Sequence, residues 1–376
     1  MKRVLHVVMT MDTGGVENWL LHVVRRLDPT RIRFEFAVAT GQGGAYVEEM
    51  EARGARVHFL GCGRDPVRLA SRLARLLRRH GPYDAIHGHL HHVNGVVGWV
   101  GARAKVPLRI AHSHLDTSYF DARGGPVRAF YRRGLRRMIQ RYANVHLAVS
   151  ARAADSLFGL GWRDDPRVRI LPCGLDYSRF SALPDKAEAR RRVGLPADAV
   201  VFGSIGRLEV QKNHAFLFDV MAALRARLPD ARLVLVGKGS LEAALRARAR
   251  ALGLAEQVLF AGARDDVPEL LAAMDLFLFP SLFEGLGLAP IEAQAAGIPC
   301  LISDQVPSEV ILFPDRVRAL PLGDAARWAA HALELLGLPR LEGAAAAVEA
   351  SPFGMEAHLS ALLSVYDAAP RARRVV

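Results

Sequence analysis

Short aliphatic and β-branched runs alternate with longer amphipathic segments along most of this chain, and that alternation limits the folds it can adopt. In the first half, the pattern predicts strands over 3–9, 32–39, 55–59, 84–88, 107–112 and 144–149. The segments between them, such as 16–27, 44–53 and 66–80, have the periodicity of amphipathic helices. Apolar strands that alternate with helices are typical of parallel βαβ units whose sheet is covered on both faces.

The alternation is interrupted near 180–198, where the charged segment 185–192 resembles a linker. It then resumes, with strands predicted over 200–205, 232–236, 258–261, 275–279 and 299–302. We therefore predict an α/β fold with two Rossmann-like, doubly wound domains that face each other across an interdomain cleft. The predicted domains are 1–183 and 184–350, followed by a C-terminal segment, 351–376. Ligands of such sheets bind beyond the carboxyl ends of the strands.

The amino-acid composition indicates in which compartment the protein works and which kind of partner it binds. Cys62, Cys173 and Cys300 lie far apart and have no metal-ligand spacing, which favours a reducing compartment. No apolar run is long enough to span a bilayer, and Met1–Arg3 leads directly into a strand instead of a signal sequence. We expect a cytoplasmic protein, with or without peripheral attachment to the inner face of the plasma membrane. The formal net charge of +12 favours a polyanionic partner, such as nucleic acid, anionic lipid or a phosphorylated substrate.

Two loops of the second half carry residues suited to a diphosphate. Arg207 and Lys212 follow the strand at 200–205, and Gly237 and Gly239 follow the strand at 232–236. Arginine offers a planar fork of donors and lysine a point charge, so the two side chains can converge on one diphosphate. Taken alone, each loop has a simpler explanation: a solvated charge pair for Arg207 and Lys212, and a tight turn for Gly237 and Gly239.

The most specific segment follows the strand at 275–279. It contains Glu284, Gly285, Leu286, Gly287, Leu288, Pro290, Glu292 and Gly297. Pro290 suits the first turn of a helix and Gly297 its end. The amides around 285–288 then surround a helix N-terminus, where phosphate binds readily. Glu292 is predicted within the first helical turn, where it either accepts hydrogen bonds from a hydroxyl or complements the helix dipole.

Other polar groups have competing interpretations. Gly14 and Gly15 follow the first strand and open a helix, as an anion-binding loop or a tight turn does. The dense group His87, His89, His91 and His92 has no cysteine or carboxylate that completes a metal site, so we expect these side chains to line the cleft or be exposed. Asp266 is interpreted as a helix cap.

The segment 123–141 combines basic and apolar residues at helical spacing. Its arginines are Arg123, Arg128, Arg132, Arg133, Arg136, Arg137 and Arg141. A basic amphipathic helix can lie on an anionic membrane, but a solvated helix face explains the same pattern. Both interpretations stay open.

Taken together, these motifs resemble the retaining glycosyltransferases of family 4, which have the GT-B fold. The features that carry the resemblance, in the family's order, are Gly14-Gly15-Val-Glu17, Gly206-Arg207 with Lys212-Asn213, Val236-Gly-x-Gly239, Phe260-x-Gly262 and Glu284-x7-Glu292. Ile110-Ala-His-Ser-His114 and Ala148-Val-Ser150 resemble the branch that builds exopolysaccharide and capsule. Cys173 stands where the family usually has asparagine.

The resemblance implies roles for individual residues. Arg207 and Lys212 would hold the donor diphosphate, Glu292 the ribose, and Glu284 the donor sugar. Gly15, with Gly14, would contact the distal phosphate. His114 is the candidate for the catalytic histidine of the cleft, with His112 as the neighbouring alternative. The remaining donor-site positions are Gly237, Gly239, Arg264, Gly285, Leu286, Gly287 and Leu288. The last segment would be a helix that crosses back onto the first domain.

The implied activity is retaining transfer from a nucleotide sugar to a glycan or lipid-linked acceptor in surface polysaccharide synthesis, with no cofactor or metal. UDP is the default nucleotide, and GDP remains compatible with the sequence around 261–264. The alternatives are a nucleotide-sugar epimerase or phosphorylase of the same fold, an inactive scaffold, and a basic nucleic-acid-binding protein. No RNA-recognition strand or reading helix supports the last of these.

Overall fold

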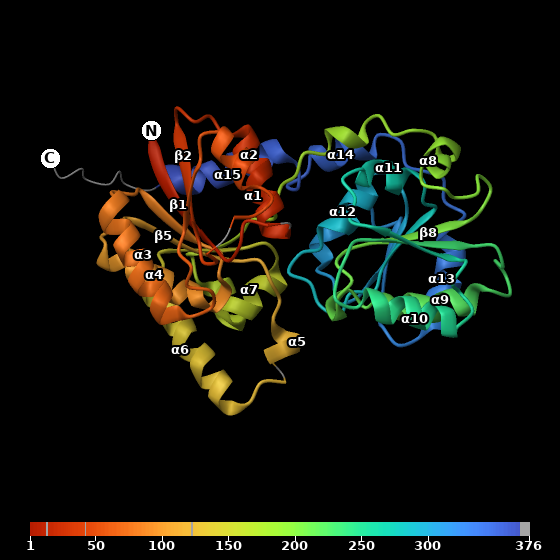
Figure 1. Ribbon diagram of the computed structural model, residues 1–376, viewed down its shortest axis with the longest axis horizontal. Coiled ribbons are helices and arrows are strands. Elements are labelled where there is room, and N and C mark those ends of the chain that lie inside the picture. Colours follow the sequence, from red (N-terminus) through yellow and green to blue (C-terminus); the bar gives the residue numbers. More distant parts are fainter. Residues whose placement is uncertain (13, 42, 122, 369–376) are drawn as a thin grey trace. The chain divides into compact units, whose positions relative to one another are not determined.

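The computed structural model describes residues 1–12, 14–41, 43–121 and 123–368, which form two compact units (Figure 1). Unit 1 comprises Met1–Leu175 together with Met355–Val376, and unit 2 comprises Asp176–Gly354. We predicted the breaks between domains after residues 183 and 350. Of the predicted C-terminal segment 351–376, residues 369–376 lie outside the described residues.

Unit 1 is built on one parallel sheet. Its seven strands, counted over the described residues, follow the order β3-β2-β1-β4-β5-β6-β7. They are β1 (Lys2–Val8), β2 (Ile32–Val38), β3 (Arg56–Phe59), β4 (Ala85–Gly88), β5 (Leu108–Ser113), β6 (Val145–Ala148) and β7 (Val168–Ile170). The order changes direction between β1 and β4, which is the switch point where doubly wound sheets bind ligands. The edge strand β7 was not predicted, because three residues are too few to show a periodicity.

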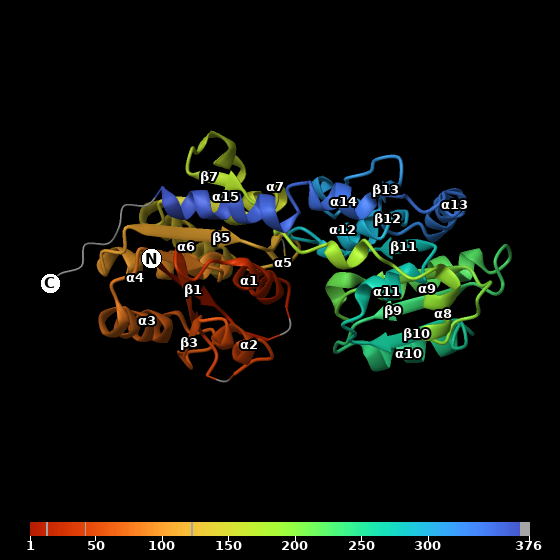
Figure 2. The ribbon, with the colours of Figure 1, turned by 90° about the horizontal axis from the view of Figure 1, so that it is seen from above.

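Helices cover both faces of this sheet. They are α1 (Gly15–Arg26), α2 (Val47–Ala52), α3 (Pro66–His80), α4 (Asn94–Arg103), α5 (Ser118–Asp121), α6 (Pro126–Tyr142), α7 (Ala151–Phe158) and α15 (Met355–Asp367). Leu5 and Val7 of β1 pack with α3 and α4 in one core cluster. His6 points to the opposite face, because successive strand residues alternate, and its ring contacts Tyr366 of α15. Figure 2 shows α15, in blue, lying along unit 1.

Unit 2 repeats the plan with a six-stranded parallel sheet, again counted over the described residues, in the order β10-β9-β8-β11-β12-β13. Its strands are β8 (Val201–Ile205), β9 (Arg232–Val236), β10 (Val258–Gly262), β11 (Leu276–Phe279), β12 (Cys300–Ser303) and β13 (Val317–Leu320). Its helices are α8 (Lys186–Arg192), α9 (His214–Leu224), α10 (Glu242–Ala251), α11 (Val267–Ala272), α12 (Leu288–Ala295), α13 (Ala325–Leu335) and α14 (Ala344–Glu349). Its core packs Phe202 and Leu276 against Phe218 and Trp328. The switch point lies between β8 and β11.

Short 3-10 turns complete the two units: η1 (His91–Val93), η2 (Leu160–Asp164), η3 (Ser178–Phe180), η4 (Val210–Lys212) and η5 (Ser308–Val310). None of the helices in the described ranges combines the length and the apolar character that crossing a bilayer requires.

The interpretation of 185–192 as a linker is wrong. This charged segment forms α8, and the Asp185 side chain caps the helix by accepting a hydrogen bond from the Glu188 amide at 2.9 Å. Arg190 is buried and its guanidinium bonds to Asp275 Oδ2 at 2.6 Å. This ion pair holds α8 to unit 2, so the helix contains few apolar residues. The periodicity of apolar residues does not reveal a contact of this kind.

Candidate functional site

The loops after β8 and β9 pack against each other beside the switch point of unit 2. The Gly206 amide donates to the Val236 carbonyl at 2.9 Å, and the Leu208 amide donates to the Lys238 carbonyl at 3.0 Å. A Cβ atom at Gly237 would lie 2.1 Å from the Gly206 carbonyl oxygen. One at Gly239 would lie 2.3 Å from the Leu208 carbonyl oxygen. These two predicted site glycines therefore allow the loops to approach each other closely.

Arg207 and Lys212 lie in the loop after β8 but in different environments. The Arg207 side chain is exposed, and no hydrogen bond or ion pair holds its guanidinium among the described residues. Lys212 Nζ contacts Glu284 Oε1 at 2.6 Å and lies 4.5 Å from the centroid of the Phe279 ring. The lysine is therefore anchored by a carboxylate and an aromatic face, whereas the arginine is available to a ligand.

Glu284, in the loop after β11, contacts Lys212 and Gln211 in the loop after β8. Its side chain is buried, with 5% of the residue exposed, and its second oxygen accepts from Gln211 Nε2 at 3.2 Å. Gln211 also donates to the Phe283 carbonyl at 3.0 Å. A buried carboxylate requires such partners, because an unpaired charge at this depth is costly. The structure thus unites two residues that the sequence assigned to one site, Lys212 and Glu284.

The glycine-rich segment after Glu284 leads into α12. Gly285 and Leu286 are buried, and Gly287 occupies the cap position with φ of 92°, which favours glycine. Within the described residues, the amides of Leu286, Gly287 and Leu288 donate to no protein acceptor. Three amides at a helix N-terminus provide donors and a positive dipole end for an anion. Gly297 follows the helix with φ of 74°, as predicted for its end.

We expected Glu292 in the first turn of this helix, and this expectation is wrong. Helix α12 begins at Leu288, ahead of Pro290, and its first turn contains no acid. Complementing the helix dipole therefore does not explain the residue. Burial raises the pKa of its carboxyl group from 4.5 to about 7. No side chain of the described residues bonds to it. A carboxyl group in this state is a candidate for binding a hydroxyl of a ligand.

Arg264 and Asp266 bond to each other. The guanidinium contacts both carboxylate oxygens of Asp266, at 2.7 and 2.5 Å, and the two side chains are equally exposed. The interpretation of Asp266 as a helix cap is wrong in one respect, because it occupies the cap position of α11 while its side chain caps no amide. Its carboxylate binds the arginine instead.

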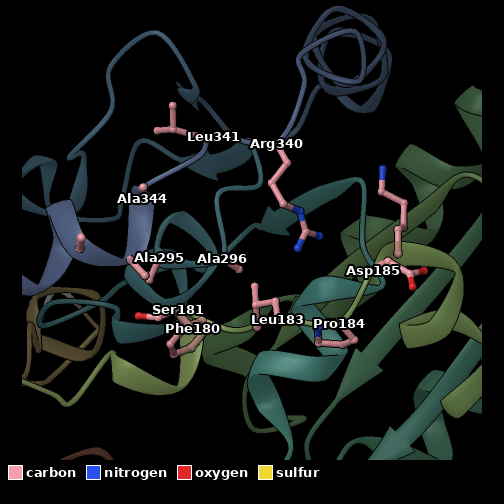
Figure 3. Close-up of a pocket in the computed structure, with 14 residues that line it drawn as sticks. Phe180, Ser181, Leu183, Pro184, Asp185, Ala295, Ala296, Arg340, Leu341 and Ala344 are labelled. Atoms are coloured by element: carbon pink, nitrogen blue, oxygen red, sulfur yellow. The ribbon is translucent and has the colours of Figure 1, made fainter.

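Unit 2 also contains a pocket of about 460 Å³ that is separate from these loops (Figure 3). Leu183, Pro184, Ala295, Ala296 and Arg340 are among the residues that line it. Ala295 is the last residue of α12, whereas the free amides are at the other end of the helix. The pocket therefore does not belong to the strand-end site.

Gly14 and Gly15 begin α1 in unit 1. Gly14 is the cap residue, and a Cβ atom there would lie 2.3 Å from Glu17 Oε2. No atom lies within 4 Å of a Cβ atom built at Gly15, so the space beside that residue is open. Glu17 accepts from Thr10 Oγ1 at 3.0 Å, which links this helix start to the end of β1.

Several histidines at the strand ends of unit 1 are bonded to one another. The expectation that the group His87, His89, His91 and His92 is exposed or lines the cleft is wrong for His87 and His92, which are buried. His87 and His112 are completely buried, and His87 Nε2 lies 3.1 Å from His112 Nδ1. His89 Nδ1 lies 2.9 Å from His114 Nε2, and both of these residues are partly exposed. Burial lowers the pKa of His114 to about 3. His114 is thus the more accessible of the two candidates 112 and 114.

Sequence reasoning missed the other members of this cluster. His6 Nδ1 lies 3.0 Å from His89 Nε2, and His87 Nδ1 lies 2.7 Å from the Tyr366 hydroxyl. Trp19 Nε1 donates to His358 Nε2 at 2.8 Å. A signal was present: His6, His87 and His112 lie near the carboxyl ends of β1, β4 and β5, which are neighbours in the sheet. It becomes visible only once the strand order is known.

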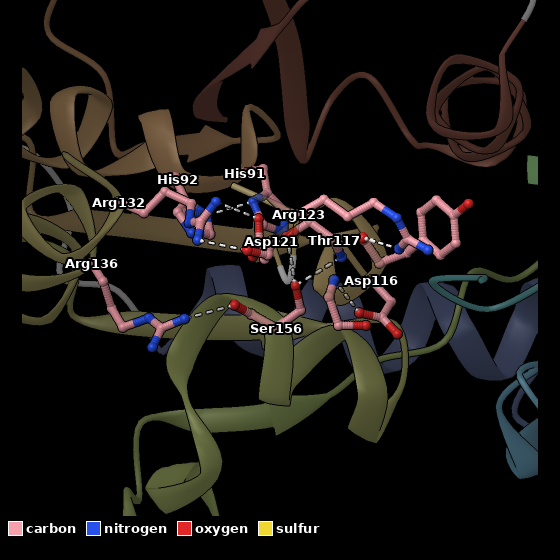
Figure 4. Close-up of polar contacts among 11 residues, drawn as sticks. His91, His92, Asp116, Thr117, Asp121, Arg123, Arg132, Arg136 and Ser156 are labelled. Carbon is pink, nitrogen blue, oxygen red and sulfur yellow. Dashed lines mark hydrogen bonds and ion pairs between the residues drawn. The ribbon is translucent and has the colours of Figure 1, made fainter. Parts of the chain in front are cut away.

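The arginines of α6 divide into two sets, and Figure 4 shows the first of them. Arg132 contacts Asp121 Oδ1 at 2.9 Å, and Arg136 donates to the carbonyls of Leu157 and Ser156 at 3.0 and 2.9 Å. These two side chains hold α6 to its own unit. A second set is exposed: Arg128, Arg133, Arg137 and Arg141. Val127 and Phe130 on the same helix are 83% and 77% exposed.

Both halves of the chain match known protein families. Residues 185–339 match the family described as Glycosyl transferases group 1, and residues 14–174 match the Glycosyl transferase 4-like domain. Over 372 residues the chain is 31% identical to "Putative glycosyltransferase EpsF" of Bacillus subtilis (strain 168), with 97% of this chain and 96% of that protein covered.

Two further similarities are informative. Over 237 residues the chain is 28% identical to the "UDP-Gal:alpha-D-GlcNAc-diphosphoundecaprenol alpha-1,3-galactosyltransferase" of Escherichia coli, covering 62% of this chain and 60% of that enzyme. The crystal structure of Anabaena Alr3699/HepE in complex with UDP and glucose superimposes with a TM-score of 0.81 at 20% identity, over 98% of this chain and 100% of that one, a likeness of fold. The two family matches and the full-length relative establish that the chain belongs to the group 1 glycosyltransferases with a family-4-like N-terminal domain and the GT-B fold.

Proposed function

We propose that this glycosyltransferase moves a sugar from a UDP-sugar to a glycan or lipid-linked acceptor, with retention of anomeric configuration, in the synthesis of a surface polysaccharide. One observation carries the donor half of the proposal. At the switch point of unit 2, the unpaired Arg207, the anchored Lys212 and three free amides at the start of α12 offer positive groups to a diphosphate. The names of the relatives support UDP and a diphosphate-linked lipid acceptor.

Departure of the nucleoside diphosphate is the step that these groups would assist. Negative charge grows on the diphosphate as the glycosidic bond breaks, and fixed donors that need no reorganisation stabilise it. Lys212 is already positioned by Glu284 at 2.6 Å, so little conformational freedom is lost when a phosphate arrives. We propose that these groups suffice without a metal ion at the diphosphate. Glu284 would then lie beside the donor sugar, with the amides of 285–288 around the phosphates.

The nucleoside end would be held by Glu292. Its carboxyl group has no protein partner in the described residues and can accept hydrogen bonds from the ribose hydroxyls. Gly237 and Gly239 would shape the adjacent loop, Arg264 would lie near the base, and Gly14 and Gly15 would contact the distal phosphate. His114, on unit 1, is the proposed catalytic histidine.

For retention, we propose a front-face route in which a phosphate oxygen of the donor takes the acceptor proton while the glycosidic bond breaks. The acceptor oxygen then attacks the same face that the diphosphate leaves. NMR of the product's anomeric proton tests this proposal, and an inverted product would refute it.

Donor binding is tested by thermal shift with UDP, GDP, ADP and their sugar conjugates. Ligands that bind the native state raise Tm by mass action. We expect UDP compounds to raise Tm in the wild type but not in Arg207→Ala or Glu292→Ala. Arg248→Ala is the matched control, since Arg248 is an exposed arginine of α10 that pairs with Asp219 at 2.8 Å. If no nucleotide shifts Tm at millimolar concentration, the donor proposal is wrong. Conversion of the donor in the absence of any acceptor would identify an epimerase instead.

Access to a lipid-linked acceptor would come through α6. Phe130, Arg137 and Arg141 are spaced at i, i+7 and i+11, so they share the exposed face of the helix, and the basic residues suit anionic headgroups. We propose that this face attaches the protein peripherally to an anionic membrane, the inner face of the plasma membrane in the cell.

Liposome cosedimentation tests the attachment. Arg133→Glu with Arg137→Glu should abolish binding to anionic vesicles, since each basic residue near such a surface contributes about 1 kcal/mol. Arg248→Glu with Arg250→Glu changes the net charge equally on exposed residues of unit 2 and should retain binding. Arg132 and Arg136 are unsuitable, because they hold internal partners. Equal cosedimentation of both double variants would refute the proposal.

A further inference from the structure

Five histidine rings meet at the switch point of unit 1. They come from the ends of three neighbouring strands: His6 from β1, His87 and His89 from β4 and the turn after it, and His112 and His114 from β5 and the turn after it. No carboxylate of the described residues bonds to any of the five. Neutral imidazoles that pack together in this way present lone pairs to one another, and imidazole is the commonest metal ligand in proteins.

Three of the rings form a convergent set. One ring nitrogen from each of His89, His112 and His114 lies within 4.8 Å of the corresponding atoms of the other two. His89 Nδ1 and His114 Nε2 are 2.9 Å apart. Ligand nitrogens of a tetrahedral zinc ion, at about 2.0–2.1 Å from the metal, are roughly 3.3 Å apart. The His89–His114 pair is therefore already close to the spacing of two ligands of one zinc ion.

The outer nitrogens of these three rings already have partners. His89 Nε2 lies 3.0 Å from His6 Nδ1, His112 Nδ1 lies 3.1 Å from His87 Nε2, and His114 Nδ1 lies 4.0 Å from the Cys173 sulfur. Protons on the outer nitrogens leave lone pairs on the inner ones. Histidine ligands of metals characteristically donate their second N–H to such an outer partner, which fixes the tautomer and the ring orientation.

His112 Nε2 supplies an independent indication. It is buried, the whole residue is 0% exposed, and it has no hydrogen-bond partner in the part of the chain that the structure describes. Buried polar atoms without partners are rare in native structures and call for an explanation. A bound ion would satisfy this lone pair together with those of His89 and His114.

We propose that His89, His112 and His114 bind a divalent transition-metal ion, of which Zn²⁺ is the best match to three imidazoles and one open position. The ion would tie the turn after β4 to the turn after β5. The alternative triad His6, His87 and His89 is less suitable, because both ring nitrogens of His87 are engaged, with the Tyr366 hydroxyl at 2.7 Å and with His112 at 3.1 Å. This site lies in unit 1 and does not depend on the donor loops of unit 2, but it shares His114 with the proposed active site, so a bound ion would hold His114 as a ligand in place of the catalytic role proposed above.

The experiment uses full-length protein without a polyhistidine tag, freed of metal by chelator and dialysis. Titration with ZnCl2 is followed by calorimetry, and titration with CoCl2 by the visible absorption of tetrahedral Co²⁺. We expect one ion per chain, and a loss of affinity of at least tenfold in His112→Ala and in His89→Ala. His331→Ala is the control, because His331 lies on α13 of unit 2 and pairs with Glu334 at 2.9 Å. It should bind like the wild type.

The outcomes separate the possibilities. Absence of stoichiometric binding by the wild type, or unchanged binding by His112→Ala, would overturn the proposal. Loss of the ion in His6→Ala with retention in His112→Ala would assign it to the other triad and also overturn ours. Far-UV circular dichroism and the UDP-induced rise in Tm, recorded on the same samples, show whether each variant is folded. A variant that responds to UDP but does not bind Zn²⁺ has lost the metal site and kept the donor site.

Discussion

Replacing Glu292 with glutamine is expected to stabilise the protein above neutral pH, even though we assign this side chain to donor binding. Burial raises the pKa of the carboxyl group from 4.5 to about 7. The folded state therefore holds the proton more tightly than the unfolded chain does, and the ionised carboxylate opposes folding. This cost is absent below pH 4.5, grows between pH 4.5 and 7, and is complete above pH 7.

The magnitude follows from the two pKa values. The difference between 4.5 and about 7 corresponds, at 1.36 kcal/mol per pH unit, to about 3 kcal/mol at pH 8 and to less than about 1 kcal/mol at pH 5. We take these figures as upper limits, since the residue is only partly buried by surface area and water reduces the cost. Glutamine has its own desolvation cost, but that cost does not depend on pH. The gain at pH 8 should therefore exceed the gain at pH 5 by about 2 kcal/mol.

Urea unfolding of wild type and Glu292→Gln at pH 5 and pH 8 measures this difference. Glu256→Gln, which alters an exposed glutamate of unit 2, is the control and should be neutral at both pH values. The affinity for UDP should fall by about tenfold or more in Glu292→Gln, as expected when a hydrogen bond to a charged group is lost. A stability difference between the variant and the wild type that is the same at pH 5 and pH 8 would refute the assignment of a buried, unpaired carboxyl group at this position.

Three further changes test the packing of the site and of unit 1. Lys212→Ala leaves Glu284 buried without its lysine partner, so we expect a loss of about 3 kcal/mol in the free energy of unfolding, measured with urea. The additional change Glu284→Ala should restore part of that loss. Additive effects of the two changes would show that the pair is not coupled. Gly237→Ala should cost about 2 kcal/mol or more, because its Cβ atom would lie 2.1 Å from a carbonyl oxygen, and an unchanged Tm would contradict the close approach of the two loops. Gly134→Ala, inside α6 with nothing within 4 Å of the new methyl group, should instead stabilise by up to about 1 kcal/mol, and a lower Tm would indicate a contact that the structure lacks.

Local sequence patterns predicted most of the architecture. Alternation of apolar strands with amphipathic helices depends on which residues face the core within one element, so it is readable from neighbours in the chain. It gave two doubly wound sheets and the main strands of both, including those that precede the loops with Arg207 and Glu284. The short edge strands β7 and β13 and the charged helix α8 were missed, because three to seven residues with few apolar positions show no period.

Pairings between loops could not be read in the same way. Lys212 and Glu284 were each assigned to the site from their positions after strands, but their contact depends on β8 and β11 being neighbours at the switch point. The residue set for the donor loops stays a prediction that the nucleotide experiments test.

The sequence by itself determined the fold class and the loops that carry polar groups, because strand and helix periodicity and turn chemistry are local properties of the chain. Only the tertiary structure decided which of those groups meet. β1, β4 and β5 lie side by side although long crossovers separate them in sequence, and this order brings His89 within hydrogen-bonding distance of both His6 and His114. Burial, which raises the pKa of Glu292 and keeps the strand histidines neutral, likewise depends on elements that pack from elsewhere in the chain.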